Sequence, residues 1–134
     1  MKFSWFRWYG RELIKSIADL MPTPPLYLLH SQHKWWNRKS VLLRLAGLNI
    51  GKNVVIDRNF FSPTLLEENI TIGDNSSVGR HFSCFAFGHI NIGTFCMFAA
   101  NVTLTNGGHE RNSLQPIAGQ LNIGNGCWIG HGAT

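Results

Sequence analysis

The spacing of apolar residues divides the chain into two parts that follow different periods. From Ile50 onward an aliphatic residue recurs every six positions, followed often by glycine, two variable residues, a small or apolar residue and one more. In residues 1–49 this pattern is absent, and apolar residues recur at the spacing of a helix. The sequence therefore predicts a helical segment over residues 1–49 and a mainly β domain built of six-residue units over residues 50–134.

The six-residue units fall into four groups, which open at Ile50, Ile72, Ile92 and Ile123. The offset is 22 residues from the first group to the second, 20 to the third and 31 to the fourth, and at least two positions agree on each. Each unit is expected to be a short strand and a corner, with the aliphatic residue pointing inward and the following glycine turning the backbone. Stacked groups would bury a column of aliphatic residues and pair their backbones. Antiparallel hairpins with Ile-Gly turns are the alternative, although hairpins favour a period of two.

The first 49 residues predict two helices. In the first, apolar residues lie at helical spacing with charged residues between them: Phe6, Tyr9, Leu13, Ile17 and Leu20. The proline-rich run 21–25 is expected to end it. A second helix is expected over about residues 34–46, with Gly47 as its stop. Two roles stay open for these helices, a cap that covers the open end of the β domain and a contact of residues 1–46 with a membrane surface.

The charge of the chain is concentrated in its first half. Residues 1–58 carry ten Lys/Arg and three Asp/Glu, whereas residues 59–134 carry two and four. An anionic partner is therefore expected at the N-terminal half. Nucleic acid is not expected as a partner, because the rest of the chain has no basic run or stacking motif.

The three cysteines indicate a reducing compartment. Cys84, Cys96 and Cys127 lack the spacing of a C-x-x-C pair and stand in apolar surroundings, where a free thiol behaves as a small hydrophobe. No stretch reaches the roughly 18 apolar residues of a spanning helix. We therefore expect a cytoplasmic protein, with peripheral attachment to the inner face of the membrane left open.

Residues 50–56 and 72–134 resemble the hexapeptide-repeat acyltransferases. Residues 98–105 with Gly108 and His109 are similar to the catalytic rung of the maltose and galactoside acetyltransferases, and residues 123–130 to the rung that follows it. Residues 42–56 are similar to the capsule and colanic-acid-type acetyltransferases. The resemblance implies a left-handed parallel β-helix, a homotrimer with sites between subunits, and transfer of an acetyl group from acetyl-CoA to a hydroxyl or amine of a saccharide, in surface polysaccharide biosynthesis.

The same resemblance implies roles for single residues. His109 would be the general base, because imidazole exchanges a proton near neutral pH; a polar loop residue without a role is the alternative. Glu110 would orient that imidazole or bind the acceptor. The binding positions are Asn106, Phe85 and Trp128 for the acceptor, and Trp128, Gly130 and Ala133 for acetyl-CoA. Packing of the wall and corner sterics are the alternatives for Trp128 and for the two small residues.

Two departures from the family pattern keep other functions open. Residues 84–89 read Cys-Phe-Ala-Phe-Gly-His where the maltose type carries an acceptor-binding Asn, which favours a larger or lipid-linked acceptor. The chain also reaches Thr134 without later rungs, so we expect residues 50–134 to be an incomplete β-helix domain. The alternative function is a catalytically incomplete trimerisation or scaffold module.

A metal-dependent hydratase on the same fold is disfavoured. The γ-type carbonic anhydrases need three histidine ligands, two of them five residues apart. No two histidines of the β domain have that spacing. No metal site is therefore expected.

Overall fold

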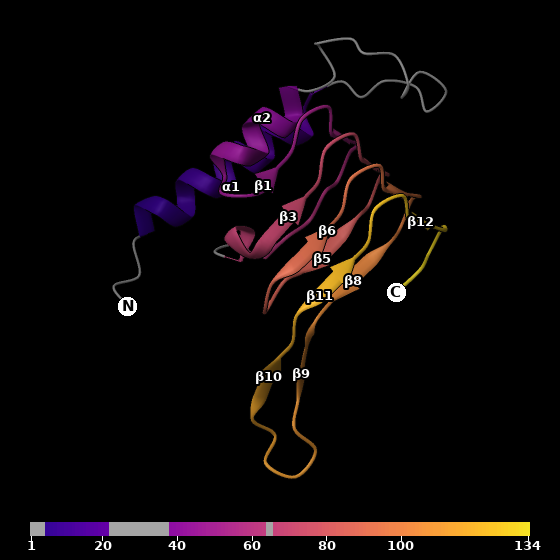
Figure 1. Ribbon diagram of the computed structural model, residues 1–134. Coiled ribbons are helices and arrows are strands. Elements are labelled where there is room, and N and C mark those ends of the chain that lie inside the picture. Colours follow the sequence, from indigo (N-terminus) through magenta and orange to yellow (C-terminus); the bar gives the residue numbers. More distant parts are fainter. Residues whose placement is uncertain (1–4, 22–37, 64–65) are drawn as a thin grey trace.

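The computed structural model describes residues 5–21, 38–63 and 66–134. Two helices, α1 (Trp5–Asp19) and α2 (Arg38–Leu45), precede a stack of short strands, and one 3-10 turn, η3 (Glu67–Asn69), interrupts the stack (Figure 1). The strands of the stack are two or three residues long: β1 (Asn49–Ile50), β2 (Val55–Ile56), β3 (Ile70–Ile72), β4 (Ser77–Val78), β5 (Ser83–Phe85), β6 (Ile90–Ile92), β7 (Met97–Phe98), β8 (Thr103–Thr105), β11 (Leu121–Ile123) and β12 (Trp128–Ile129).

These strands form three parallel sheets that the chain visits in the same order at each turn. The first sheet has the order β1-β3-β6-β11, the second β2-β4-β7-β12, and the third joins β5 to β8. A bridge from Phe61 to Ser83 extends the third sheet by one position. We call each turn of the chain a coil, and the four coils begin at β1, β3, β6 and β11. The mainly β architecture is thus confirmed, and the parallel pairing excludes antiparallel hairpins for these strands.

The register of the sheets reproduces the offsets read from the sequence. Ile50 pairs with Ile72, Ile72 with Ile92, and Ile92 with Ile123, which are steps of 22, 20 and 31 residues. The second sheet agrees, since Phe98 pairs with Ile129 across the same 31 residues. The six-residue pattern therefore predicted which backbone positions lie beside one another.

Two positions of each six-residue unit point inward and build the core. The first position carries the aliphatic column, and the fifth carries a second column that is also buried: Val54, Ser76 and Cys96 directly before the strands of the second sheet, and Phe60, Phe82 and Val102 before the third sheet. The ring of Phe82 lies between those of Phe60 and Phe98, with centroids 5.7 and 5.3 Å away. Burial raises the pKa of the Cys84 thiol to about 12, so this side chain behaves as an apolar core residue.

The expected role of glycine is corrected by the backbone angles. Positive φ occurs at the fourth position of the units, for example at Asn53 (54°), Asn75 (57°) and Phe95 (55°), and not at the glycines of the second position. Those glycines are needed because successive coils approach closely. A Cβ on Gly73 would lie 2.6 Å from the carbonyl carbon of Gly93, which no side chain tolerates. Asparagine, which enters the left-handed region more readily than most residues, makes several of the turns instead.

Helix α2 packs against the first coil. It ends at Leu45, and Gly47, the predicted stop, follows with a φ of 114°; the N–H of Leu48 returns to the carbonyl of Leu43 at 3.2 Å. Leu43 and Ala46 are buried in the core, and the Ser40 hydroxyl donates to the carbonyl of Val54 at 2.5 Å. The expected start of this helix at residue 34 and the proline-rich stop of the first helix lie outside the described residues, except for Met21.

Helix α1 attaches to the stack mainly through charged side chains. Glu67, on η3, has no exposed surface and accepts hydrogen bonds from Arg11 at 3.3 Å and from Lys15 at 3.1 Å. Arg11 also binds Glu68 at 2.5 Å, and Arg7 pairs with the same carboxylate. Among the described side chains of this helix, Ala18 is fully buried and Ile14 packs against the core beside it. The ion pairs therefore decide which side of α1 faces the coils.

Replacing Arg11 by methionine should lower the free energy of unfolding by roughly 3 kcal/mol, because the buried Glu67 carboxylate loses one of its two cations. Urea unfolding followed by circular dichroism measures the change. Arg80→Met is the matched control, since the Arg80 side chain is 57% exposed and lies 3.7 Å from the Asp57 carboxylate; a long ion pair with a solvent-exposed cation is worth less than about 1 kcal/mol. Equal losses in the two variants would contradict the assignment.

Stability should also depend on Glu68 in acid. The hydrogen bond from Arg11, and then the charge of Arg7, hold the pKa of Glu68 below its ordinary value of 4.5. A depressed carboxyl pKa stabilises the fold above the unfolded pKa, and this contribution is lost as pH falls through the folded one. The difference in urea midpoint between wild type and Glu68→Gln should thus be constant above about pH 5 and shrink below it. A difference that grows in acid would refute this account.

Candidate functional site

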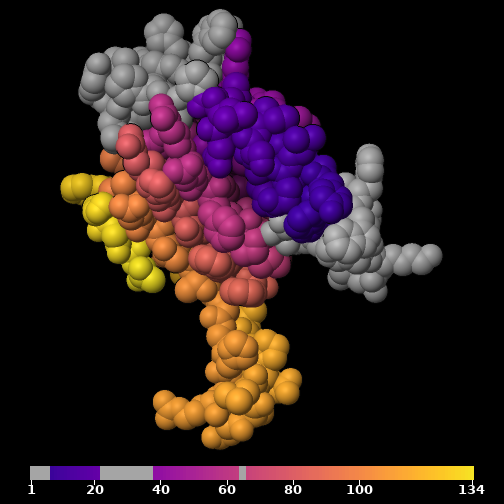
Figure 2. Space-filling model, turned by 180° about the vertical axis from the view of Figure 1, so that it is seen from behind, coloured from indigo at the N-terminus to yellow at the C-terminus, as the bar shows by residue number. Residues whose placement is uncertain are grey.

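The long insertion between the third and fourth coils leaves the stack as a β-hairpin. Its strands are β9 (Gly107–His109) and β10 (Pro116–Ala118), which pair antiparallel with His109 opposite Pro116. The hairpin departs after β8 and returns before β11, at the corner between the third and first sheets. Figures 1 and 2 show it projecting away from the stack as a separate arm. The fourth coil nevertheless resumes the register of the third.

Asn106 fastens the base of this hairpin. Its side-chain amide donates to the carbonyls of His89 at 3.1 Å and Gly119 at 2.7 Å, and its oxygen accepts the N–H of Gly88 at 3.1 Å. The backbone carbonyl of Asn106 also accepts the N–H of Gly119 at 2.8 Å. These bonds use both N–H groups of the side-chain amide and one of the two lone pairs of its oxygen. The structure thus assigns this residue a positioning role.

Two glycines allow the hairpin to lie against the second coil. A Cβ on Gly107 would collide with the ring of Phe87, and one on Gly88 would collide with the carbonyl oxygen of Gly119. These contacts set the direction in which the arm leaves the coils. The sequence did not predict these contacts. The pair Gly107-Gly108, directly before His109, was the one sequence feature that pointed to a close approach of the backbone here.

His109 and Glu110 lie on the exposed arm, near its turn. The carboxylate of Glu110 accepts a hydrogen bond from the Ser113 hydroxyl, and its backbone N–H donates to Gln115 at 2.9 Å. Among the hydrogen bonds of the described residues, none joins Glu110 to His109. The imidazole is exposed to solvent and is presented beyond the coils of its own chain.

The other predicted site residues lie on different sides of the stack. Phe85 belongs to the third sheet, where its ring centroid is 5.6 Å from that of Phe61. Trp128 belongs to the second sheet, on β12, and is 76% exposed. Gly130 faces open space, whereas Ala133 packs against the core. A single chain therefore does not bring Trp128 and Gly130 to the hairpin, as the positions of β9 and β12 show (Figure 1).

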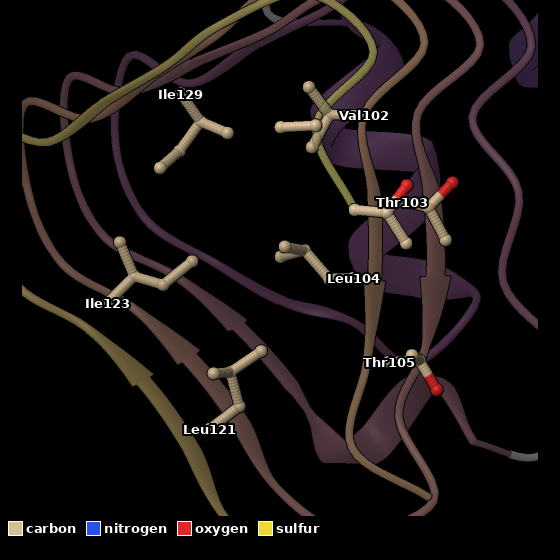
Figure 3. A pocket seen from close by; sticks show the side chains of 9 residues that line it. Val102, Thr103, Leu104, Thr105, Leu121, Ile123 and Ile129 are labelled. Atoms are coloured by element: carbon tan, nitrogen blue, oxygen red, sulfur yellow. The ribbon is translucent and has the colours of Figure 1, made fainter.

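A hollow of about 380 Å³ opens at the fourth coil (Figure 3). Its lining is mainly the inward face of the coils: Val102, Thr103, Leu104, Thr105, Leu121, Ile123, Ile129, Ala133 and Thr134. None of these lining residues carries an acidic or basic side chain, and His109 is not among them. The lining side chains of this hollow thus offer no group for acid–base chemistry.

Within residues 5–21, 38–63 and 66–134, no three His, Cys, Asp or Glu side chains are grouped so that they could hold a metal ion. No protein-family model matches the chain, and no curated protein or solved structure matches it either.

Changing Asn106 to aspartate should loosen the arm, because a carboxylate cannot donate to the carbonyls of His89 and Gly119. The readout is tryptic cleavage after Arg111, an exposed residue in the hairpin, which should become several-fold faster. Asn122→Asp is the matched control: the Asn122 oxygen only accepts, from Asn91 at 2.9 Å and from Gln120 at 3.1 Å, so aspartate keeps both bonds. Equal cleavage rates in the two variants would disprove the role of Asn106.

Proposed function

We propose that the chain is a CoA-dependent acetyltransferase that moves an acetyl group from acetyl-CoA to a hydroxyl or amine of a saccharide. The observation that carries the proposal is the hairpin arm. It holds a solvent-exposed imidazole at a fixed place beside a stack of six-residue coils. The resemblance of residues 98–109 to the catalytic rung of such enzymes supports the same conclusion.

A left-handed winding of the coils is part of this proposal. Connections between parallel strands are usually right-handed, because the twist of the strands favours that path. The strands here have only two or three residues, so little twist accumulates along them. Each corner turns instead through a residue of positive φ, as at Asn75 and His81. The ordinary cause of right-handed crossovers is therefore weak in this chain.

The proposed active site lies between copies of the chain in a homotrimer. The outer side of the second sheet exposes Met97 (42%) and Trp128 (76%), and the hairpin exposes Leu114 (73%) and Ile117 (56%). Exposed apolar side chains on a projecting arm are typical of an interface. A closed ring in which the arm of one copy reaches the second sheet of the next would cover both surfaces. It would also bring His109 to the Trp128 of a neighbour.

The chemistry of the proposed site is acyl transfer with general-base catalysis. The imidazole of His109 takes the proton of the acceptor hydroxyl while the oxygen attacks the thioester carbonyl carbon. The tetrahedral oxyanion then collapses, the carbon–sulfur bond breaks, and the imidazolium returns its proton to the CoA thiolate. Backbone N–H groups are the natural stabilisers of that oxyanion. Glu110, whose carboxylate is bonded to Ser113, is better placed to shape the hairpin turn than to orient the base.

Acetyl-CoA and the saccharide acceptor would bind to different parts of the proposed site. Trp128 and the open surface at Gly130 are accessible to acetyl-CoA, whereas the side chain of Ala133 packs against the core. Phe85 supplies an apolar wall for a large or lipid-linked saccharide acceptor. The free cysteines suit the cytoplasm, where surface polysaccharide precursors would be modified.

His109→Ala should lower kcat/KM for acetyl transfer by about 10²- to 10⁴-fold while the oligomeric state stays unchanged. Release of the CoA thiol in the presence of a panel of saccharides measures turnover, and sedimentation should give three times the 15.1 kDa chain mass. His89→Ala, which removes an exposed imidazole from the neighbouring coil, should keep the wild-type rate.

Equal rates for His109→Ala and wild type would remove this residue from the mechanism. A trimer that transfers no acetyl group to any saccharide of the panel would instead favour the scaffold module. A monomer would contradict the interface on which the site depends.

A further inference from the structure

The outward side of α1 is apolar, although helices of globular proteins normally turn that side to the core. Tyr9, Leu13 and Ile17 follow one another at four-residue intervals and lie on one side of the helix, and Leu20 follows directly after its last residue. They are 61%, 62%, 46% and 86% exposed. We call these four residues the apolar stripe. Figure 2 shows α1, in indigo, lying across the outside of the coils.

The apolar stripe cannot rotate inward without breaking the attachment of α1. The opposite side of the helix carries Ala18, which has no exposed surface, and the cations that neutralise the fully buried Glu67. Turning the stripe toward the coils would leave that carboxylate unpaired, which is strongly unfavourable. The same ion pairs that dock α1 therefore hold its apolar side toward the solvent.

Helix α2 adds apolar surface of the same kind. Val41 and Leu45, also four residues apart, are 48% and 67% exposed, while Leu43 between them is buried in the core. The two helices lie beside each other on the first coil (Figure 1). Single exposed apolar residues are common on proteins, but two aligned sets on adjacent helices are a feature of surfaces that bind.

The net charge of the first half of the chain favours an anionic partner. Residues 1–68 contain ten Lys/Arg and five Asp/Glu, a balance of +5, whereas residues 69–134 contain two of each and balance to zero. The entire net charge of +5 thus belongs to the half that carries the apolar stripe. A second copy docking through the same half would bring two positive net charges together, whereas an anionic surface is attracted.

We propose that the apolar stripe docks on an anionic lipid membrane, with α1 lying in the interface. The aliphatic residues would enter the boundary between headgroups and acyl chains, and the basic half of the molecule would be held by the anionic headgroups. No helix among the described residues is long and apolar enough to span a membrane, and an interfacial helix does not need to be. This attachment is independent of the acetyltransferase activity.

The test is flotation of the full-length chain with two kinds of vesicle, phosphatidylcholine alone and phosphatidylcholine with phosphatidylglycerol. Wild type should bind the anionic vesicles, and more weakly at high salt. Leu13→Gln/Ile17→Gln should lower the partition coefficient by about tenfold or more, because both side chains lose their apolar character. Leu13→Met/Ile17→Met is the matched control and should bind as wild type does, since the apolar surface is kept.

The exposure of both positions predicts that all variants fold, which circular dichroism and urea unfolding verify. Binding by the glutamine variant equal to that of wild type would overturn the proposal, as would the absence of wild-type binding to either vesicle. A change of oligomeric state in the glutamine variant with unaltered vesicle binding would identify the apolar stripe as a contact between copies, which also overturns it.

Discussion

Between the second and third coils, the backbone at Gly73 comes so near to Gly93 that a Cβ there would lie 2.6 Å from a carbonyl carbon. This approach lets strands of two or three residues pair along their whole length, and it keeps inward residues such as Ile72 and Ile92 in one column. A single coil could not bury these residues, because each coil is covered only by the coils directly above and below it. The fold thus depends on contact between successive coils in a constant register.

A frame of this kind tolerates a long insertion at a corner. The chain leaves the stack after β8, forms the hairpin and returns so that Ile123 pairs with Ile92. The parallel pairing of the first sheet therefore continues across the insertion. The insertion is then fixed where it departs, by the bonds of Asn106 and by the ring of Phe87 against Gly107. His109 therefore takes its position from the coils, although it does not touch the core. Rigid support beneath an exposed side chain is what a catalytic or binding group requires.

The sequence predicted the parts of the fold that repeat and missed the parts that occur once. Ile50, Ile72, Ile92 and Ile123 recur at offsets that equal the observed register, because the same packing selects the same residue in each coil. The contact of the Glu67 carboxylate with Lys15 spans 52 residues, and that of the Asn106 amide with Gly119 spans 13. Each occurs once in the fold, so no sequence repeat predicts it. The reason for glycine at the second position was also hidden, since close approach between coils is not a property of one unit.

The orientation of α1 follows from the same difference between periodic and single contacts. Helical spacing in the sequence shows that α1 is amphipathic, but it does not show which side meets the coils. The buried Glu67 decides this, because Arg11 and Lys15 must turn inward to neutralise it, and Leu13 and Ile17 are then turned outward. The helices on the first coil thus carry an exposed apolar surface, while the hairpin projects from a corner between the third and fourth coils. Since separate coils support these two surfaces, contact at α1 leaves the arm and its imidazole free to meet a second partner.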